Sequence, residues 1–174
     1  MKEMLRYGFI LSLICVVASG LLAGMNSLTK SKIIAQAQAE EDLSLKGVMP
    51  EAMHFEAVKS GEETVYYKAH DKEGKLIGVA FKASGKGYSS IVETMVGMNL
   101  DGTLVAIKIL SQNETPGLGA RVSESSFTDQ FDNKNIQGLS EIQAITGATI
   151  SSRAVIDSVK KKAEEIQALL KNEK

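Results

Sequence analysis

The chain has 174 residues, enough for one ordinary domain and an anchor but too few for two full domains. Lysine and arginine total 20, and aspartate and glutamate total 21, so there is no basic excess that would indicate nucleic-acid binding. The only cysteine, Cys15, excludes a disulfide within the chain and an iron–sulfur site made of cysteines. His54 and His70 lie in no metal-ligand spacing with it, and we predict no metal site.

The N-terminal segment predicts a single-pass membrane anchor over residues 1–29. Tyr7–Thr29 contains no charged side chain, and a helix of this length spans a bilayer core of about 30 Å. A cleaved signal peptide is one alternative, but its best cleavage site, Ala35-Gln36-Ala37, lies well beyond the apolar run. A lipid attached to Cys15 is another, disfavoured because Ile14 precedes it and apolar residues follow.

Residues 30–50 are predicted to form a stalk. Apolar residues and an acidic cluster can continue the helix beyond the bilayer, and Gly47 and Pro50 then end it. Basic residues flank the apolar run on both sides, so the positive-inside rule only slightly favours an N-terminus in the cytoplasm. Residues 51–174 are expected to form one domain on a single side of the membrane.

Four strands are predicted in the first half of this domain. Each is rich in residues that favour β-structure, and short turns separate them. The predicted strands are Thr64–Ala69, Leu76–Ala83, Ile91–Met98 and Leu104–Leu110. The first turn is Asp71–Lys75, and the glycine-rich sequence SGKGYSS follows the second strand. Short connections of this kind predict an antiparallel meander.

Helices are predicted in the second half. Ser111–Arg121 is typical of a loop, and Ser123–Phe131 of a short helix with Phe127 and Phe131 on one face. From Ser152 onward, apolar residues recur at the spacing of an amphipathic helix. The predicted fold class is therefore α+β: an N-terminal transmembrane helix, an antiparallel sheet, and a C-terminal amphipathic helix against that sheet.

The first segment with the features of a binding site is ITGATISS, just before the C-terminal helix. Its small residues let a bulky group approach the backbone, and a following helix N-terminus suits a phosphate. The candidate binding residues here are Thr146, Gly147, Ala148, Thr149, Ser151 and Ser152. The alternative is that Ser151 or Ser152 only caps the helix.

The second such segment is ETPGLG, after the fourth predicted strand. Its proline and glycines predict a tight turn from which Leu118 projects. The candidate residues are Glu114, Thr115, Gly117, Leu118 and Gly119. The alternative is a simple connection between elements. Glu114 has two interpretations of its own: a solvated surface charge, or a group that fixes the loop through backbone N–H groups.

Together, ETPGLG and TGAT-x-S, in this order behind a single span, resemble the FMN-binding domain family. The nearest resemblance is to the G-subunit of Rnf-type electron-transport complexes, and the C-subunit of the sodium-translocating NADH:quinone reductase is a longer relative. The resemblance extends over the whole chain and includes the Gly85-x-Gly87-Tyr88 loop.

The resemblance implies that Thr149 carries FMN in a phosphoester bond, installed by a separate flavin transferase with FAD as donor. It also implies that the ETPGLG loop packs beside the isoalloxazine ring. The implied function is electron relay in an ion-translocating ferredoxin:NAD oxidoreductase of the inner membrane, with other membrane subunits as partners and the domain on the extracytoplasmic side. The chain is then a non-autonomous subunit, and we assign it no catalytic residue.

Two positions depart from the family pattern. The family usually has Asp six residues before the modified Thr, where this chain has Gln143, with Glu141 nearby. The family loop often begins with His, where this chain has Gln112. Two other functions remain open at this point: a flavinylated domain that serves another extracytoplasmic reductase, and a flavin-free structural subunit.

Overall fold

The computed structural model describes residues 2–61 and 63–172. It begins with one continuous helix, α1 (Lys2–Val48). The chain divides into two compact units, of which the first ends at Asp42 and the second is Leu43–Lys174. The helix boundary at Val48 agrees with the stop predicted from Gly47 and Pro50, because proline cannot continue a helix.

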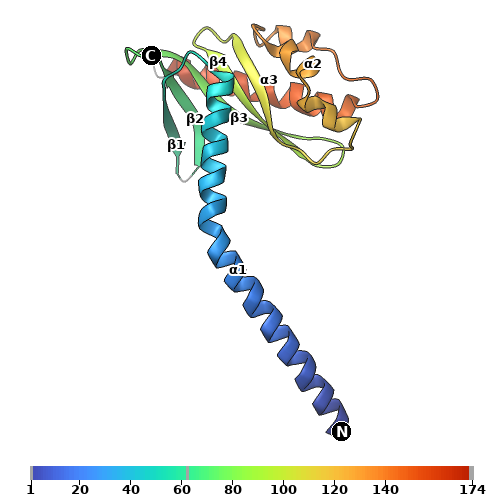
Figure 1. The fold of residues 1–174 in the computed structure, drawn as a ribbon. Coiled ribbons are helices and arrows are strands. Elements are labelled where there is room, and N and C mark those ends of the chain that lie inside the picture. The colour runs from blue at the N-terminus through green and yellow to red at the C-terminus, as the bar shows by residue number, and fades with distance from the viewer. Residues whose placement is uncertain (1, 62, 173–174) are drawn as a thin grey trace. The chain divides into compact units, whose positions relative to one another are not determined.

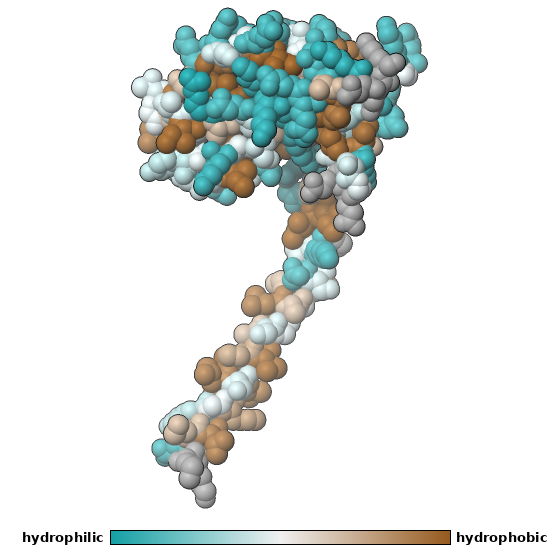
Figure 2. Space-filling model, turned by 180° about the vertical axis from the view of Figure 1, so that it is seen from behind, coloured by the Kyte–Doolittle hydropathy of each residue, from teal (hydrophilic) through white to brown (hydrophobic). Residues whose placement is uncertain are grey.

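Within the described residues, α1 is the only helix that is long and apolar enough to cross a membrane. The most apolar stretch of this helix is entirely unburied in the structure. Large apolar side chains, among them Leu5, Phe9 and Leu21, are exposed along it, and Figure 2 shows this hydrophobic surface. Such a surface is compatible with hydrocarbon and unfavourable in water.

The last turn of α1 belongs to the second unit. Leu45 and Val48 are buried there in a small hydrophobic cluster with residues from one face of the sheet. The backbone of Val48 approaches the sheet so closely that a Cβ on Gly97 would lie 2.2 Å from the Val48 carbonyl oxygen. The C-terminal part of the segment predicted as a stalk therefore packs as part of this compact unit.

The sheet is an antiparallel meander, as predicted, but it has five strands rather than four (Figure 1). In spatial and chain order these are β1 (His54–Ser60), β2 (Glu63–His70), β3 (Leu76–Lys86), β4 (Ile91–Asn99) and β5 (Leu104–Ser111). The strand that the sequence did not predict, β1, lies at the edge of the sheet and is mostly exposed. The side chains of β1 are exposed or half-buried without regular alternation, so its sequence lacks the periodic pattern that predicts a strand.

The other layer consists of helices. It comprises the 3₁₀ helix η1 (Gly119–Ser123), α2 (Ser125–Thr128), η2 (Asp129–Phe131), η3 (Gly138–Glu141) and α3 (Thr149–Asn172). The predicted short helix Ser123–Phe131 is thus broken into short pieces, although Phe127 and Phe131 do pack together, with ring centroids 5.5 Å apart.

The C-terminal helix α3 packs against β3 and β4 (Figure 1). Its buried side chains follow the predicted amphipathic pattern: Val155, Ile156, Val159, Ala163 and Ile166. Leu169, which the pattern also placed on this face, is 38% exposed near the helix end. The helix begins at Thr149, three residues before the predicted start at Ser152. Thr149 is therefore the first residue of α3 rather than part of a preceding loop.

Candidate functional site

The TGAT segment forms a tight turn that leads directly into α3. The Ala148 N–H donates to the Ile145 carbonyl (2.9 Å), and Gly147 has φ +82°, a value that glycine adopts without strain. The Ser152 hydroxyl donates to the Ala148 carbonyl (2.9 Å) and accepts from the Ile145 N–H (3.0 Å). Ser152 therefore fixes the turn, and Thr149 emerges from it exposed.

The interpretation of Ser151 or Ser152 as the helix cap is wrong. Because α3 begins at Thr149, both serines lie inside its first turn, and both side chains are buried. The capping position precedes the first helical residue. The first turn of α3, whose N–H groups have no partners within the helix, begins at the exposed residue Thr149.

The ETPGLG segment forms the predicted tight turn. The Leu118 and Ala120 N–H groups donate to the Thr115 carbonyl (3.1 and 3.2 Å), and Gly117 has φ +75°. Leu118 projects from this turn with 47% of its surface exposed. A Cβ built on Gly147 would lie 3.4 Å from Leu118 Cδ2, so the two motifs contact each other.

Glu114 joins the ETPGLG loop to two other segments, and it is 5% exposed. Its Oε1 accepts from the N–H groups of Ser89 (3.0 Å) and Ser90 (2.8 Å), and its Oε2 accepts from that of Tyr88 (3.1 Å). The Ser151 hydroxyl also donates to Oε2. The second interpretation of Glu114, fixation through backbone N–H groups, is therefore confirmed.

The hydrogen bonds to Glu114 outweigh its desolvation. Burial raises the pKa of this carboxyl, but the hydrogen bonds from the Ser151 hydroxyl and from the backbone of Ser90, Ser89 and Tyr88 lower it from 4.5 to about 2. Glu114 is consequently a carboxylate at neutral pH.

Two glycines make room for this carboxylate. A Cβ on Gly87 would lie 2.6 Å from Glu114 Oε1. A Cβ on Gly119 would lie 2.6 Å from Ser151 Oγ and 2.9 Å from Glu114 Cβ. All three distances are shorter than van der Waals contact, so the close packing of the three segments around Glu114 depends on glycine at both positions.

A cavity of about 550 Å³, here called the motif cavity, opens where the two motifs meet. Its lining residues are Tyr88, Thr115, Leu118, Gly119, Gly147, Ala148, Thr149, Ile150 and Ser151. Of the remaining predicted site residues, Glu114 and Ser152 are buried beside it, and Thr146 and Gly117 are exposed. Sequence reasoning did not select Tyr88 or Ile150. The position of Tyr88 in the glycine-rich GKGY sequence was the available signal for it.

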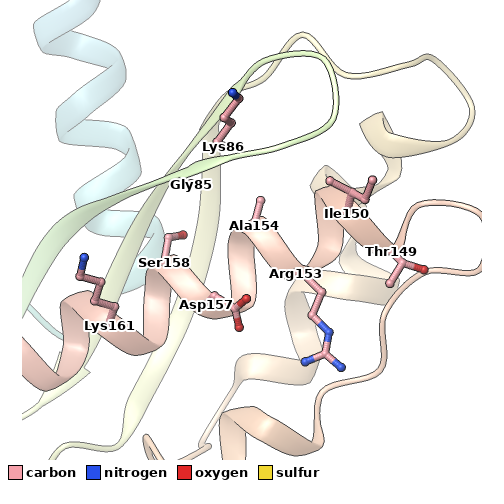
Figure 3. Close-up of a pocket in the computed structure, with 9 residues that line it drawn as sticks. All are labelled: Gly85, Lys86, Thr149, Ile150, Arg153, Ala154, Asp157, Ser158 and Lys161. Carbon is pink, nitrogen blue, oxygen red and sulfur yellow. The ribbon is translucent and has the colours of Figure 1, made fainter.

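A second cavity, of about 490 Å³ and here called the helix groove, lies between β3 and α3 (Figure 3). Its lining residues are Gly85, Lys86, Thr149, Ile150, Arg153, Ala154, Asp157, Ser158 and Lys161. It carries three basic side chains and one acidic one, whereas the motif cavity has no charged residue in its lining. Thr149 lines both cavities.

Of the two positions that depart from the family pattern, Gln112 is half-buried, and its side-chain oxygen accepts from the Glu114 N–H (2.7 Å), whereas Gln143 lies at the surface. Gln143 is exposed, and its N–H donates to the side chain of Gln130 (2.9 Å). Glu141 is exposed and forms an ion pair with Lys134 (3.4 Å). Both side chains therefore lie on the accessible segment that precedes the TGAT turn.

Parts of the chain are similar to solved structures. NqrC of Shewanella oneidensis is 19% identical and aligns with a TM-score of 0.49 over 70% of this chain and 74% of that chain. The C-subunit of the Na⁺-translocating NADH-quinone reductase from Parabacteroides distasonis is 20% identical and aligns with a TM-score of 0.48 over 59% of this chain and 60% of that chain.

Sequence comparisons cover nearly the whole chain. Residues 87–164 match the model of the FMN-binding domain, and residues 1–48 match the RnfG N-terminal region. The chain is 34% identical to the G-subunit of the proton-translocating ferredoxin:NAD⁺ oxidoreductase complex of Clostridium ljungdahlii, over 90% of this chain and 88% of the relative. It is 32% identical to the G-subunit of the Na⁺-translocating complex of Acetobacterium woodii, over 98% and 95%. The chain therefore belongs to the G-subunit family of the ion-translocating oxidoreductase complexes, and it contains an FMN-binding domain.

Proposed function

We propose that this chain is an electron-transfer subunit of an ion-translocating ferredoxin:NAD⁺ oxidoreductase complex, and that FMN is bound covalently to Thr149 through its phosphate. The names of the similar subunits support the first part, and the match to the FMN-binding domain supports the cofactor. The observation that carries the attachment site is the exposed Thr149 at the start of α3, at the meeting point of two cavities.

The residues of the motif cavity fit a flavin. Ligand sites typically enclose about 300–1,000 Å³ behind mainly apolar walls, with a few polar groups that orient the ligand. Here Leu118 and Ile150 provide apolar surface, Tyr88 provides an aromatic ring, and Thr115 provides a hydroxyl. When bound, FMN supplies reversible electron transfer, and the protein orients the ring and sets its potential.

Thr149 is suited to accept the flavin phosphate. In the proposed reaction, Thr149 Oγ bonds to the flavin-side phosphorus of FAD, the pyrophosphate bond breaks, AMP leaves, and the hydroxyl proton passes to a base of the flavin transferase. The resulting phosphodiester has one negative charge. We expect the first-turn N–H groups of α3 and the guanidinium of Arg153, one helical turn onward, to stabilise that charge.

The direct test is the mass of the chain after co-expression with a flavin transferase. We expect an increase equal to one FMN less one water, and we expect peptide mapping to place it on Thr149. An unchanged mass in a protein that retains flavin until denaturation would contradict covalent attachment. Copurification of other membrane subunits tests the assignment to a complex.

Leu118 is expected to orient the flavin ring rather than to determine attachment. Leu118→Ala should leave the amount of covalent flavin near that of the wild type, because Thr149 is unchanged. It should alter the flavin absorption spectrum or midpoint potential and slow turnover of the assembled complex, because one apolar wall of the motif cavity is lost.

Leu118→Met is the matched control, since it conserves side-chain volume and apolar character. It should change the spectrum and potential much less than the alanine variant. If Leu118→Ala and the wild type have the same spectrum, potential and turnover, the ETPGLG loop is only a connection.

The apolar part of α1 anchors the chain in the membrane, and we propose that the domain lies on the extracytoplasmic side. The test is a cysteine at an exposed position of α3, Ala168→Cys, in a Cys15→Ala background. A thiol reagent that cannot cross the inner membrane should label this cysteine in cells whose cell envelope is permeabilised outside an intact inner membrane. Labelling that requires rupture of the inner membrane would place the domain in the cytoplasm.

A further inference from the structure

Three segments that are distant in the sequence meet at the carboxylate of Glu114. They are the loop after β3, the ETPGLG loop itself and the first turn of α3. Each contributes lining residues to the motif cavity: Tyr88, Leu118 and Thr149 respectively. Glu114 lies behind this lining and is almost completely buried.

We propose that Glu114 is a positioning residue, which holds Tyr88, Leu118 and Thr149 around one preformed cavity without contacting the flavin itself. This inference rests on the proposed function, because it assumes that the motif cavity is the flavin site. It extends the role of Glu114 from fixing the ETPGLG loop to holding all three segments that line the motif cavity.

The carboxylate has no acceptor capacity left for a ligand. A carboxylate offers about four lone-pair positions on its two oxygens. Oε1 is occupied by the N–H groups of Ser89 and Ser90, and Oε2 by the N–H of Tyr88 and the hydroxyl of Ser151. The Ser90 hydroxyl approaches Oε1 as well, at 3.3 Å. Glu114 is therefore fully engaged by the protein before any cofactor binds.

The site specifically requires a negative charge. Three consecutive N–H groups, those of Tyr88, Ser89 and Ser90, converge on the carboxylate and form an anion-binding concavity. Glutamine at position 114 retains only one acceptor oxygen, and its amide N–H₂ group would face other donors. Some of the converging donors would then be buried without a partner, which is costly.

The hydrogen bonds to Glu114 stabilise the flavin site rather than the fold as a whole. The main hydrophobic core is formed by residues of the sheet and of the helical layer and does not include the loop at Tyr88–Ser90. Loss of the carboxylate therefore releases the loop and the first turn of α3, while the core continues to hold the sheet and helix together.

The proposal is tested with the full chain in detergent, with and without covalent flavin. In Glu114→Gln, hydrogen exchange of the Tyr88–Ser90 amides should accelerate by roughly tenfold or more, because charge-assisted hydrogen bonds are the stronger class. The visible circular dichroism of the bound flavin should change, because its surroundings are no longer fixed. Glu114→Asp retains the charge and should lie between Glu114→Gln and the wild type.

Glu93→Gln is the matched control, because Glu93 is an exposed carboxylate on β4. It should leave both measurements unchanged. Wild-type exchange and wild-type flavin circular dichroism in Glu114→Gln would overturn the proposal. If that variant does not fold, Ser151→Ala, which removes one hydrogen bond to the carboxylate, decides the question by the same two measurements.

Failure of this inference can be distinguished from failure of the proposed function. The exchange measurement on the flavin-free chain reports on Glu114 whether or not Thr149 is ever modified. A wild-type chain that gains no flavin mass contradicts the proposed function alone. A flavinylated chain in which Glu114→Gln changes neither measurement contradicts the positioning role alone.

Discussion

Replacing Thr149 with alanine is expected to abolish covalent flavin completely. The substitution removes the only atom that the proposed phosphoester uses, and neither of the buried serines that follow can replace it. Ser151 donates to Glu114 and Ser152 donates to the Ala148 carbonyl, so both hydroxyls are engaged inside the protein. The measurement is flavin fluorescence on a denaturing gel, together with the mass of the intact chain.

The fold should survive this substitution. Thr149 is exposed, and surface substitutions outside special features usually change the free energy of unfolding by less than about 0.5 kcal/mol. Two variants serve as controls. Thr149→Ser retains a hydroxyl and should keep covalent flavin, and Thr146→Ala should keep at least part of it. Fluorescence that persists on the gel in Thr149→Ala would place the attachment elsewhere.

Replacing Gly85 with alanine is expected to cause a large loss of stability. A Cβ on Gly85 would lie 2.1 Å from the Ala154 carbonyl oxygen and 2.7 Å from the Ala154 carbonyl carbon. Both atoms belong to the backbone of α3, so no flexible side chain can move aside. Either α3 or β3 must shift, and we expect a loss of about 3 kcal/mol, the upper end of the usual range for overpacking.

This loss should also reach the functional site, because Gly85 and Thr149 line the same groove. The measurement is the urea concentration at the midpoint of unfolding of the full chain, with near-ultraviolet circular dichroism as the signal. Flavin incorporation is measured in parallel. The control is Gly47→Ala, where the added Cβ would make only an ordinary 3.7 Å contact with the side chain of Lys108. Equal midpoints for Gly85→Ala and the wild type would show that β3 and α3 can separate without cost.

Much of the fold could be predicted because it depends on local patterns. The charge-free run Tyr7–Thr29 predicted the long apolar helix, and runs of β-favouring residues separated by short turns predicted β2 to β5. The spacing of apolar residues predicted the buried face of α3. In these cases a residue's immediate neighbours in the sequence contain most of the information.

The errors arose where local patterns are weak. The edge strand β1 has few buried residues, so its sequence has no clear periodicity. The spacing of apolar residues predicts that α3 begins at Ser152, whereas the helix begins at Thr149. The hydroxyl of Ser152 instead stabilises the preceding turn by bonding to Ile145 and Ala148.

The sequence by itself determined the two motifs and the turns within them, since Gly117 and Gly147 supply the backbone angles that those turns require. The tertiary structure alone decided how the motifs are joined. Glu114 meets Ser90, 24 residues before it, and Ser151, 37 residues after it. Neither separation has a sequence signature, because the order of the strands and the packing of α3 on the sheet determine which loops become neighbours.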